Sequence, residues 1–328
     1  MVIVLFLPMI LLSGCKERTF KERGFLKDVP MSIIVVAKKK PEWGKIFSFV
    51  DREVSVFDYR LKTSPLWELN HVGRAVLSGD LLDTVRESLR VARESGGAFD
   101  PAIWALTRLW DFDEGGRLPK REEIKIARAY VDYKQVSIKE LDGNRALVIL
   151  PRGFGLDLGG IAKGEIVDLL ADYLNRLGYD QFLIEAGGDI LVSGLKIDRK
   201  WRIGIRHPRR LNEFLAIIPF GRRGERMSIV TSGDYEQYFV KNGIRYNHII
   251  DPRTGYPARD VVSVTVIDTS CRRADALSTA AFVLGYSEGL SFLEREGVEG
   301  LLVREDNGRL ECEKTPGFPL NLGEINLN

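Results

Sequence analysis

Leu156-Asp157-Leu158-Gly159-Gly160-Ile161-Ala162-Lys163-Gly164 places two glycines between two apolar segments. The pattern predicts a short strand over 156–158 that leads into a helix over about 161–177, which ends at Gly178. Glycines at such a turn let the backbone approach a ligand closely, and the first N–H groups of the helix can bind a phosphate. Lys163 would add a positive charge there. A tight strand–helix turn with a solvated lysine explains the same residues equally well.

The segments on either side of this turn set the expected fold class. After Gly178, short apolar and β-branched segments predict strands at 182–185, 190–192, 201–205, 214–218, 235–240, 244–250 and 261–267. Before the turn, we expect a strand over 26–37, helices over 41–56, 77–95 and 119–130, and a hairpin of 136–138 with 146–150. Helices and strands do not alternate as they would in a doubly wound parallel sheet. We therefore expect an α+β fold, a mostly antiparallel sheet with packed helices in a single domain.

Composition and charge limit the classes of function. The chain has 328 residues, of which 45% are hydrophobic and 29% are charged, as is typical of a globular protein with a sizeable core. The formal net charge is only +2. Because nucleic-acid binding depends on a strong positive field, no nucleic-acid partner is expected.

The N-terminus is typical of an exported lipoprotein. Residues 1–12, MVIVLFLPMILL, are almost entirely apolar but too few to span a membrane, and Leu12-Ser13-Gly14-Cys15 resembles a bacterial lipobox. We expect a signal peptide with lipobox over 1–15, a charged tether over 16–25 and a single folded domain over 26–328. Acylated Cys15 would anchor the protein to a membrane of the bacterial cell envelope, facing the periplasm or the exterior. The alternative is a buried N-terminal segment that holds a thiol.

Two further segments contain glycine or histidine at strand ends. Glu185-Ala186-Gly187-Gly188-Asp189 lies between two apolar strands, and a plain hairpin turn is its simpler interpretation. His248 is one of three histidines and ends a strand just before the loop Asp251-Pro252-Arg253-Thr254-Gly255. Loops at strand ends often present reactive side chains. A structural and a catalytic histidine are equally compatible with this position.

A last segment, Arg273-Ala274-Asp275-Ala276-Leu277-Ser278-Thr279, suggests a cation site. On a helix, Asp275 and Thr279 lie one turn apart on the same face, with Ser278 beside them. A carboxylate and hydroxyls are hard oxygen ligands that suit magnesium better than zinc. Taken alone, Asp275 is better explained as the N-terminal cap of an ordinary buried helix. The other cysteines, Cys271 and Cys312, are expected to be separate thiols.

Taken together and in this order, the segments resemble the ApbE family, the FAD:protein FMN transferases. The resemblance covers about residues 26–305 and is most specific after Leu156. Earlier similarities are Ser64, Asn70 and Gly97-Ala98-Phe99-Asp100-Pro101. It implies an enzyme that cleaves FAD at its pyrophosphate and attaches FMN, through a phosphoester, to a Ser or Thr of an exported acceptor protein.

The resemblance also implies roles for individual residues. Mg²⁺ would be bound by Asp275 and Thr279, helped by Ser278 and the backbone carbonyl of Gly160. FAD would be contacted by Asp157, Lys163 and Ile249, in a pocket also lined by Tyr59, Asp100, Pro101 and Ala102. His248 would assist the acceptor hydroxyl.

This chain departs from the family at one place. Family members usually carry Met-Gly-Thr at the first strand, where the methionine contacts the flavin nucleotide, and this chain has Lys27-Asp28-Val29. Two other functions use the same residues. One is a pyrophosphatase that hydrolyses FAD to FMN and AMP, and the other is a lipid-anchored flavin-binding protein without turnover.

Overall fold

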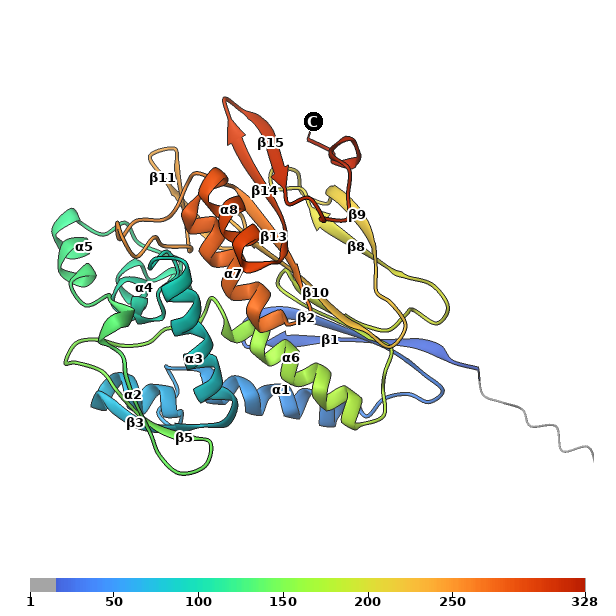
Figure 1. Ribbon diagram of the computed structural model, residues 1–328, viewed down its shortest axis with the longest axis horizontal. Helices are drawn as coiled ribbons and strands as arrows, with labels where there is room; N and C mark the ends of the chain where they lie inside the picture. Colours follow the sequence, from blue (N-terminus) through green and yellow to red (C-terminus); the bar gives the residue numbers. More distant parts are fainter. Residues whose placement is uncertain (1–15, 328) are drawn as a thin grey trace, which may run out of the picture.

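A central eight-stranded sheet organises the fold, in the order β1-β2-β6-β7-β10-β13-β14-β15 with antiparallel neighbours throughout (Figure 1). The computed structural model describes residues 16–327, so the predicted signal peptide and Cys15 lie outside the described residues. The strands of the sheet are β1 (Arg18–Leu26), β2 (Val29–Ala37), β6 (Phe182–Ala186), β7 (Asp189–Ser193), β10 (Arg226–Gly233), β13 (Ser263–Asp268), β14 (Glu299–Asp306) and β15 (Arg309–Lys314).

Smaller sheets and helices surround it. The small sheets are β3-β5-β4, β8-β9 and β11-β12, with β3 (Arg74–Ser78), β4 (Ser137–Glu140), β5 (Arg145–Ile149), β8 (Trp201–Arg206), β9 (Phe214–Phe220), β11 (Tyr238–Lys241) and β12 (Ile244–Asn247). The α-helices are α1 (Trp43–Phe57), α2 (Pro65–Val72), α3 (Gly79–Glu94), α4 (Trp104–Trp110), α5 (Arg121–Arg128), α6 (Ala162–Arg176), α7 (Cys271–Leu284) and α8 (Tyr286–Glu296). Within residues 16–327, none of these helices is long and apolar enough to cross a membrane.

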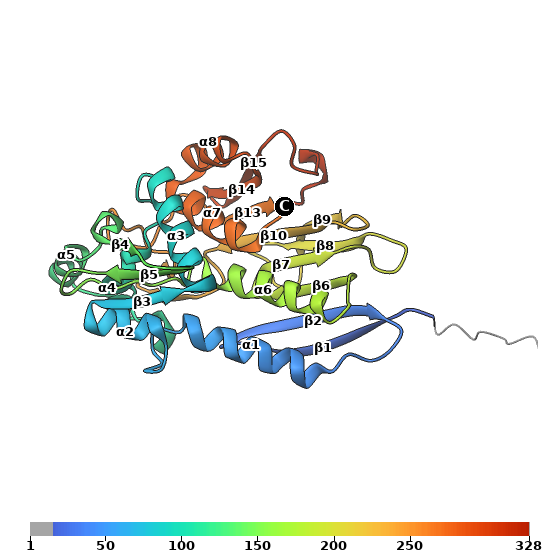
Figure 2. The same ribbon diagram turned by 60° about the horizontal axis from the view of Figure 1, so that its bottom comes forward.

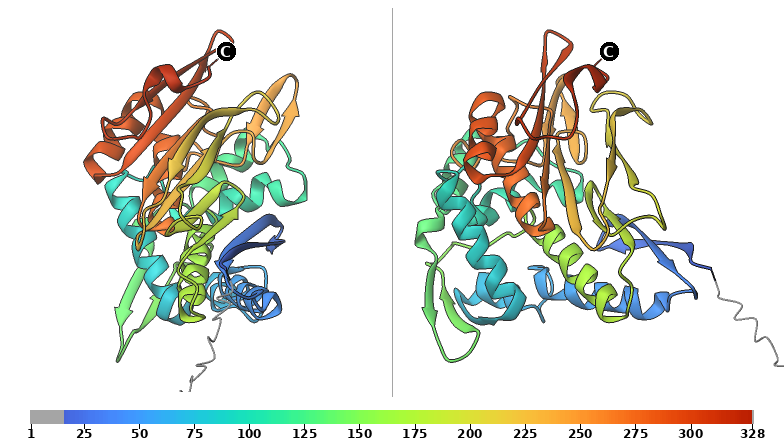
Figure 3. Two further views of the ribbon diagram at one scale, coloured as in Figure 1. Left: turned by 90° about the vertical axis from the view of Figure 1, so that its right-hand side faces the viewer. Right: turned by 45° about the vertical axis from the view of Figure 1, so that its right-hand side comes forward.

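The central sheet is covered on both faces. Helices α6 and α7 lie against one face, and the β8-β9 hairpin covers the other (Figure 3). Alternate residues of β10 show the division, because Val230 joins the helical core and Ile229 packs with the hairpin core. Because both faces of the sheet are covered, β13 is buried at every position except its last, Asp268, instead of at every second one.

Helices α3, α4 and α5 gather with the β3-β5-β4 sheet at one end of the central sheet (Figure 2). A separate small core lies here around Trp110, which packs with Ile124 and with Tyr246 of β12. The Trp110 indole N–H donates to the carbonyl of Gly255 at 2.9 Å. This bond ties the loop that follows His248 to α4.

The expected fold class is confirmed, as are most of the predicted elements. Helix α6 ends just before Gly178, which has a φ of +85°, and the predicted hairpin over 136–150 is β4-β5. The helix expected over 77–95 begins as strand β3 and becomes helical at Gly79. Cys271 and Cys312 are separate thiols, as expected. Elements β10, β14, β15, α2, α4 and α8 were not predicted as such.

The prediction of a charged tether over 16–25 is wrong for most of its length. Residues Arg18–Leu26 form β1 and pair in register with β2, so the folded domain begins at Arg18. An edge strand needs to bury only part of one face, and charged side chains suit it because they discourage pairing with other chains. Phe20 packs on the core, and Gly24 lies so close to the Phe47 ring of α1 that a Cβ there would be 2.3 Å from it.

The predicted strand over 156–158 is also wrong. This segment has no strand partner, and its backbone groups bond elsewhere. The Leu156 N–H and C=O both pair with the side-chain amide of Asn70 at 2.8 Å, and the Asp157 N–H donates to the carbonyl of Pro101 at 2.8 Å. Tertiary hydrogen bonds therefore replace the ladder that the apolar pattern predicted.

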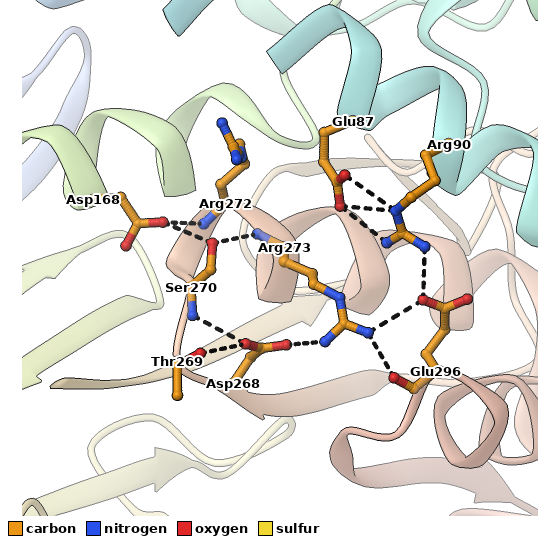
Figure 4. Close-up of polar contacts among 9 residues, drawn as sticks. All are labelled: Glu87, Arg90, Asp168, Asp268, Thr269, Ser270, Arg272, Arg273 and Glu296. Carbon is orange, nitrogen blue, oxygen red and sulfur yellow. Dashed lines mark hydrogen bonds and ion pairs between the residues drawn. The ribbon is translucent and has the colours of Figure 1, made fainter. Parts of the chain in front are cut away.

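A polar network holds α7 against its neighbours (Figure 4). The Arg273 guanidinium pairs with Asp268 at the end of β13, and donates to the Glu296 carbonyl of α8 at 2.6 Å. Glu296 also accepts from Arg90 of α3 at 3.0 Å. At the start of α7, the Asp168 carboxylate of α6 accepts the N–H groups of Cys271 and Arg272 at 3.1 and 3.0 Å. Four elements thus fix the position of this helix.

We expect Arg273→Ala to lower the free energy of unfolding by about 2–4 kcal/mol, because it leaves the largely buried Asp268 carboxylate without its cation and removes one of the two guanidinium groups that contact Glu296. Arg222→Ala is the matched control, since that guanidinium and its partner Glu225 are both exposed, and a surface pair contributes about 0–1 kcal/mol. Urea unfolding followed by circular dichroism measures both. Equal losses in the two variants would contradict the assigned role of the network.

Candidate functional site

The glycine turn at 159–160 lies directly against α7. A Cβ added to Gly160 would be 3.1 Å from the Phe99 ring and 3.3 Å from the Thr279 methyl group. No larger residue fits without displacing one of these side chains. The turn therefore brings the start of α6 and the predicted ligand Thr279 together.

Helices α6 and α7 also touch one turn further on, at Gly164. A Cβ on Gly164 would lie 2.4 Å from the carbonyl oxygen of Cys271, which is a backbone atom and cannot rotate away. The Gly164 N–H donates to Asp275 Oδ2 at 3.1 Å. Asp275 is in the second turn of α7 and only 3% exposed, and the helix is capped by Ser270. The interpretation of Asp275 as the helix cap is therefore excluded.

A buried charge cluster forms at this junction. Lys163 Nζ lies 2.8 Å from Asp189 Oδ2 and 3.5 Å from Asp275 Oδ1. Burial alone would lower the pKa of Lys163, but the charges of Asp189 and Asp275 outweigh it and raise that pKa. Two carboxylates share a single ammonium group, so the cluster has room for one more positive charge, either a proton or a cation.

The turn Gly187-Gly188 places Asp189 in this cluster. Both glycines have positive φ, +57° and +96°, as the tight turn of a two-residue hairpin requires. Asp189 is the first residue of β7 and is 1% exposed. Its Oδ1 is buried and has no hydrogen-bond partner in the described part of the chain. The hairpin interpretation of this segment was right about the turn but missed the carboxylate that it positions.

Hydroxyl groups line the neighbouring side of the site. Ser232 Oγ of β10 lies 2.8 Å from Ser278 Oγ and 3.4 Å from Thr279 Oγ1. Ser278 is fully buried and also donates to the Asp275 carbonyl at 3.0 Å. Thr279 is the more exposed of the two predicted hydroxyl ligands. Ser232 was not predicted as a site residue, because nothing local in the sequence indicates that it lies beside α7.

The donor set fits a hard divalent cation. Residues 16–327 contain no cluster of three His, Cys, Asp or Glu side chains that could hold a metal. The site instead offers the carboxylates of Asp275 and Asp189 with the hydroxyls of Thr279 and Ser278. Mg²⁺ accepts such a sparse oxygen set because it keeps several waters and uses substrate phosphates as ligands. The orphaned Asp189 Oδ1 is the observation that fits this group best.

The residues expected around FAD lie next to this cluster. Asp157 Oδ1 accepts the Gly159 N–H at 2.8 Å. The Asp157 N–H is bound by the Pro101 carbonyl, so the Asp100–Ala102 segment lies against the glycine turn. The buried Asp100 carboxylate accepts the Ala102 N–H at 2.8 Å, and burial raises its pKa to about 6. Burial raises the pKa of Tyr59, and the negative charge of Asp157 raises it further.

His248 follows β12, and its ring is close enough to the cluster to respond to its charges. Burial lowers its pKa to about 4, the charge of Lys163 lowers it and that of Asp275 raises it. His248 Nδ1 lies 3.2 Å from the carbonyl oxygen of Gln237. A carbonyl can only accept, so Nδ1 carries the proton and Nε2 is the basic nitrogen. Ile249 is buried beside it, in the core cluster that includes Phe99 and Ala102.

Lys27, the residue at which this chain departs from the usual sequence of the family, also lies near this site. Lys27 forms the β1-β2 turn with a φ of +55°, and its ammonium lies 3.6 Å from Asp58. Its positive charge also acts to lower the pKa of Asp157, although burial keeps that pKa raised. A cation therefore stands near the predicted FAD contact where the family usually has a methionine.

A glycine turn at a helix start, a lysine, a hard-cation donor set and a neutral histidine are the features expected of a site that binds a nucleotide phosphate. The model of the ApbE family matches residues 28–302, and the chain belongs to this family. It is 34% identical over 281 residues to the FAD:protein FMN transferase of Treponema pallidum, covering 80% of this chain and 76% of that protein.

Two solved structures share the fold. The ApbE protein of Thermotoga maritima has a TM-score of 0.81 at 30% identity, covering 93% of this chain and all of that one. The flavin transferase ApbE of Vibrio cholerae has a TM-score of 0.79 at 30% identity, covering 92% of this chain and 99% of that one. Both agree with the mixed antiparallel sheet and packed helices described above.

Proposed function

We propose that this protein transfers FMN from FAD to a Ser or Thr hydroxyl of an exported acceptor protein and releases AMP, with Mg²⁺ as its cofactor. The observation that carries the proposal is the buried Lys163–Asp189–Asp275 cluster beneath the Gly159-Gly160 turn, with His248 beside it. Membership of a family whose curated relatives are flavin transferases supports it.

The proposed reaction is a displacement at phosphorus. The acceptor oxygen forms a bond to the phosphorus next to riboflavin, and the bond from that phosphorus to the bridging pyrophosphate oxygen breaks. The electron pair of the broken bond leaves with AMP. The proton of the acceptor hydroxyl must go to a base, because the hydroxyl does not ionise on its own near pH 7.

Each side chain contributes to this reaction in a different way. Asp275 and Thr279, with Ser278 and the Gly160 carbonyl, would hold Mg²⁺, which would supply charge neutralisation of the pyrophosphate oxygens. Lys163, fixed by two carboxylates, would present its ammonium group to the same oxygens. Asp157, Ile249, Tyr59 and the Asp100–Ala102 segment would hold FAD. Preorganised charges of this kind stabilise the transition state without reorganisation.

His248 would act as the base. Its Nδ1–H is held by the Gln237 carbonyl, so the ring orientation is fixed and Nε2 is free to accept the proton. Its low pKa keeps the ring neutral, and therefore able to accept a proton, across the physiological range. The same low pKa makes it a weak base, which fits proton transfer that is completed only as the new P–O bond forms.

The proposed reaction is tested by the mass of an acceptor. The purified protein is incubated with FAD, Mg²⁺ and a candidate acceptor, and the acceptor is then weighed by mass spectrometry while AMP is measured by chromatography. We expect the acceptor to gain the mass of FMN less water, in step with AMP release. AMP release with no gain would indicate a pyrophosphatase. Intact FAD would indicate a flavin-binding protein without turnover.

We expect His248→Ala to slow transfer about a hundredfold or more, because the acceptor hydroxyl loses its base. In the unaltered protein, activity should decline only as the pH falls through about 4, since the lowered pKa keeps the ring neutral below 6.5. The exposed His71, which stacks on Trp67, provides the control His71→Ala, and this variant should keep full activity. Transfer at the wild-type rate by His248→Ala would show that the role is wrong.

We also propose that acylated Cys15 anchors the domain to a membrane of the cell envelope. The Leu-Ser-Gly-Cys sequence supports this, as does its distance of three residues from the start of β1. We expect Cys15→Ser to move the protein from the membrane to the soluble fraction when a producing bacterium is fractionated. An unchanged distribution would contradict the anchor.

A further inference from the structure

Asp189 is the least satisfied polar side chain in the site. Its Oδ2 accepts from Lys163 at 2.8 Å, and its Oδ1 is buried with no partner in the described part of the chain. The oxygens of the neighbouring Asp275 differ in this respect. Asp275 Oδ2 accepts the Gly164 N–H, and Oδ1 lies 3.5 Å from Lys163. The unused acceptor in the cluster is therefore Asp189 Oδ1.

Burial makes the unpaired Asp189 Oδ1 energetically unfavourable. A carboxylate that loses hydration without gaining a hydrogen bond is strongly destabilised, and a single ammonium group offsets only part of this penalty. The carboxylate could avoid the cost by reaching solvent, but β7 holds it at 1% exposure behind the Gly187-Gly188 turn. A fold that keeps such an oxygen buried provides a donor for it in the working state. A proton shared between the two carboxylates can satisfy this oxygen before a ligand binds, and a ligand or its water takes that place in the working state.

The surroundings show which donor fits. The Lys163 ammonium group is within reach of both carboxylates, and it already forms ion pairs with Asp189 Oδ2 and Asp275 Oδ1. The hydroxyls of Ser232 and Ser278 are engaged with each other at 2.8 Å. The excess of one carboxylate over the ammonium attracts a positive group. A hydrated divalent cation supplies both the charge and O–H donors, because Mg²⁺ retains several of its waters in protein sites.

We propose that Asp189 is a further residue of the cation site, with Oδ2 fixing the Lys163 ammonium and Oδ1 accepting a hydrogen bond from a water of the bound cation. This inference rests on the proposed function, which places the cation on Asp275 and Thr279. Asp189 would then contact both positive charges that face the pyrophosphate, the Lys163 ammonium group directly and the cation through its water. It is a positioning residue, since it acts on FAD through Lys163 and the water.

Binding of Mn²⁺, measured without FAD by the electron paramagnetic resonance signal of the free ion, tests the proposal independently of activity. We expect Asp189→Asn to weaken Mn²⁺ binding about 10–100-fold, the usual cost of removing an outer-shell partner. Asp275→Asn should weaken it further. Asp172→Asn is the matched control, because it removes the same charge from an exposed position on α6, and it should leave binding unchanged.

The Asp189→Asn variant is expected to fold, because Lys163 and Asp275 remain as a balanced pair. If it does not, Lys163→Met is compared with the double variant Lys163→Met/Asp189→Asn, which leaves a neutral pair of side chains. The proposal expects the double variant to bind Mn²⁺ at least tenfold more weakly than Lys163→Met.

The outcomes separate this inference from the proposed function. Equal Mn²⁺ affinity of Asp189→Asn and the unaltered protein, with Asp275→Asn weakened, would overturn the role of Asp189 alone. Unchanged affinity in Asp275→Asn would overturn the cation site itself and with it the cofactor in the proposed function. Weakening in both Asp189→Asn and Asp275→Asn, with Asp172→Asn unaffected, supports the inference.

Discussion

The contact between α6 and α7 is the constraint on which the site depends. Gly164 lets the two helices meet at backbone distance, and its N–H holds Asp275 in the interior, where a carboxylate would otherwise be unstable. The same approach places Lys163 between Asp275 and Asp189. A larger residue at 164 would separate the two helices and disrupt the arrangement of Lys163, Asp189 and Asp275. The network around Arg273 fixes the position of α7. The Asp168 carboxylate of α6, which accepts the Cys271 N–H at the start of α7, does the same.

This arrangement suits chemistry on a pyrophosphate. Charges inside a protein act on one another more strongly than charges in water. A fixed ammonium group and a fixed carboxylate therefore interact strongly with any charged group bound next to them. The glycine turn above them exposes backbone to a ligand, and the half-buried histidine stays neutral because desolvation lowers its pKa to about 4. The three parts come from segments around residues 160, 189 and 250. The central sheet brings β7 and β10 against α7, and the histidine follows β12, which belongs to the separate β11-β12 sheet.

Local sequence patterns were sufficient to predict part of the fold and of the site. The apolar period and Gly178 fixed α6, and the glycine turns were expected at their observed places. The charged β1 was missed because an edge strand needs little apolar surface, and 156–158 was misassigned because Asn70, far away in the chain, supplies its hydrogen bonds. Asp275 alone suggested a helix cap, and only the approach of Gly164 makes it an interior carboxylate. The importance of Asp189 could not be predicted, since it depends on a lysine 26 residues earlier in the chain.

We propose that the pyrophosphate of FAD is bound and cleaved at the α6–α7 junction. The most direct test is a crystal structure of the protein with FAD and Mg²⁺, using the slowly reacting His248→Ala variant to preserve the dinucleotide. We expect the pyrophosphate against the Gly159-Gly160 turn, within reach of Lys163, with the cation on Asp275 and Thr279. Density for FAD elsewhere on the molecule, with this junction filled only by solvent, would contradict it.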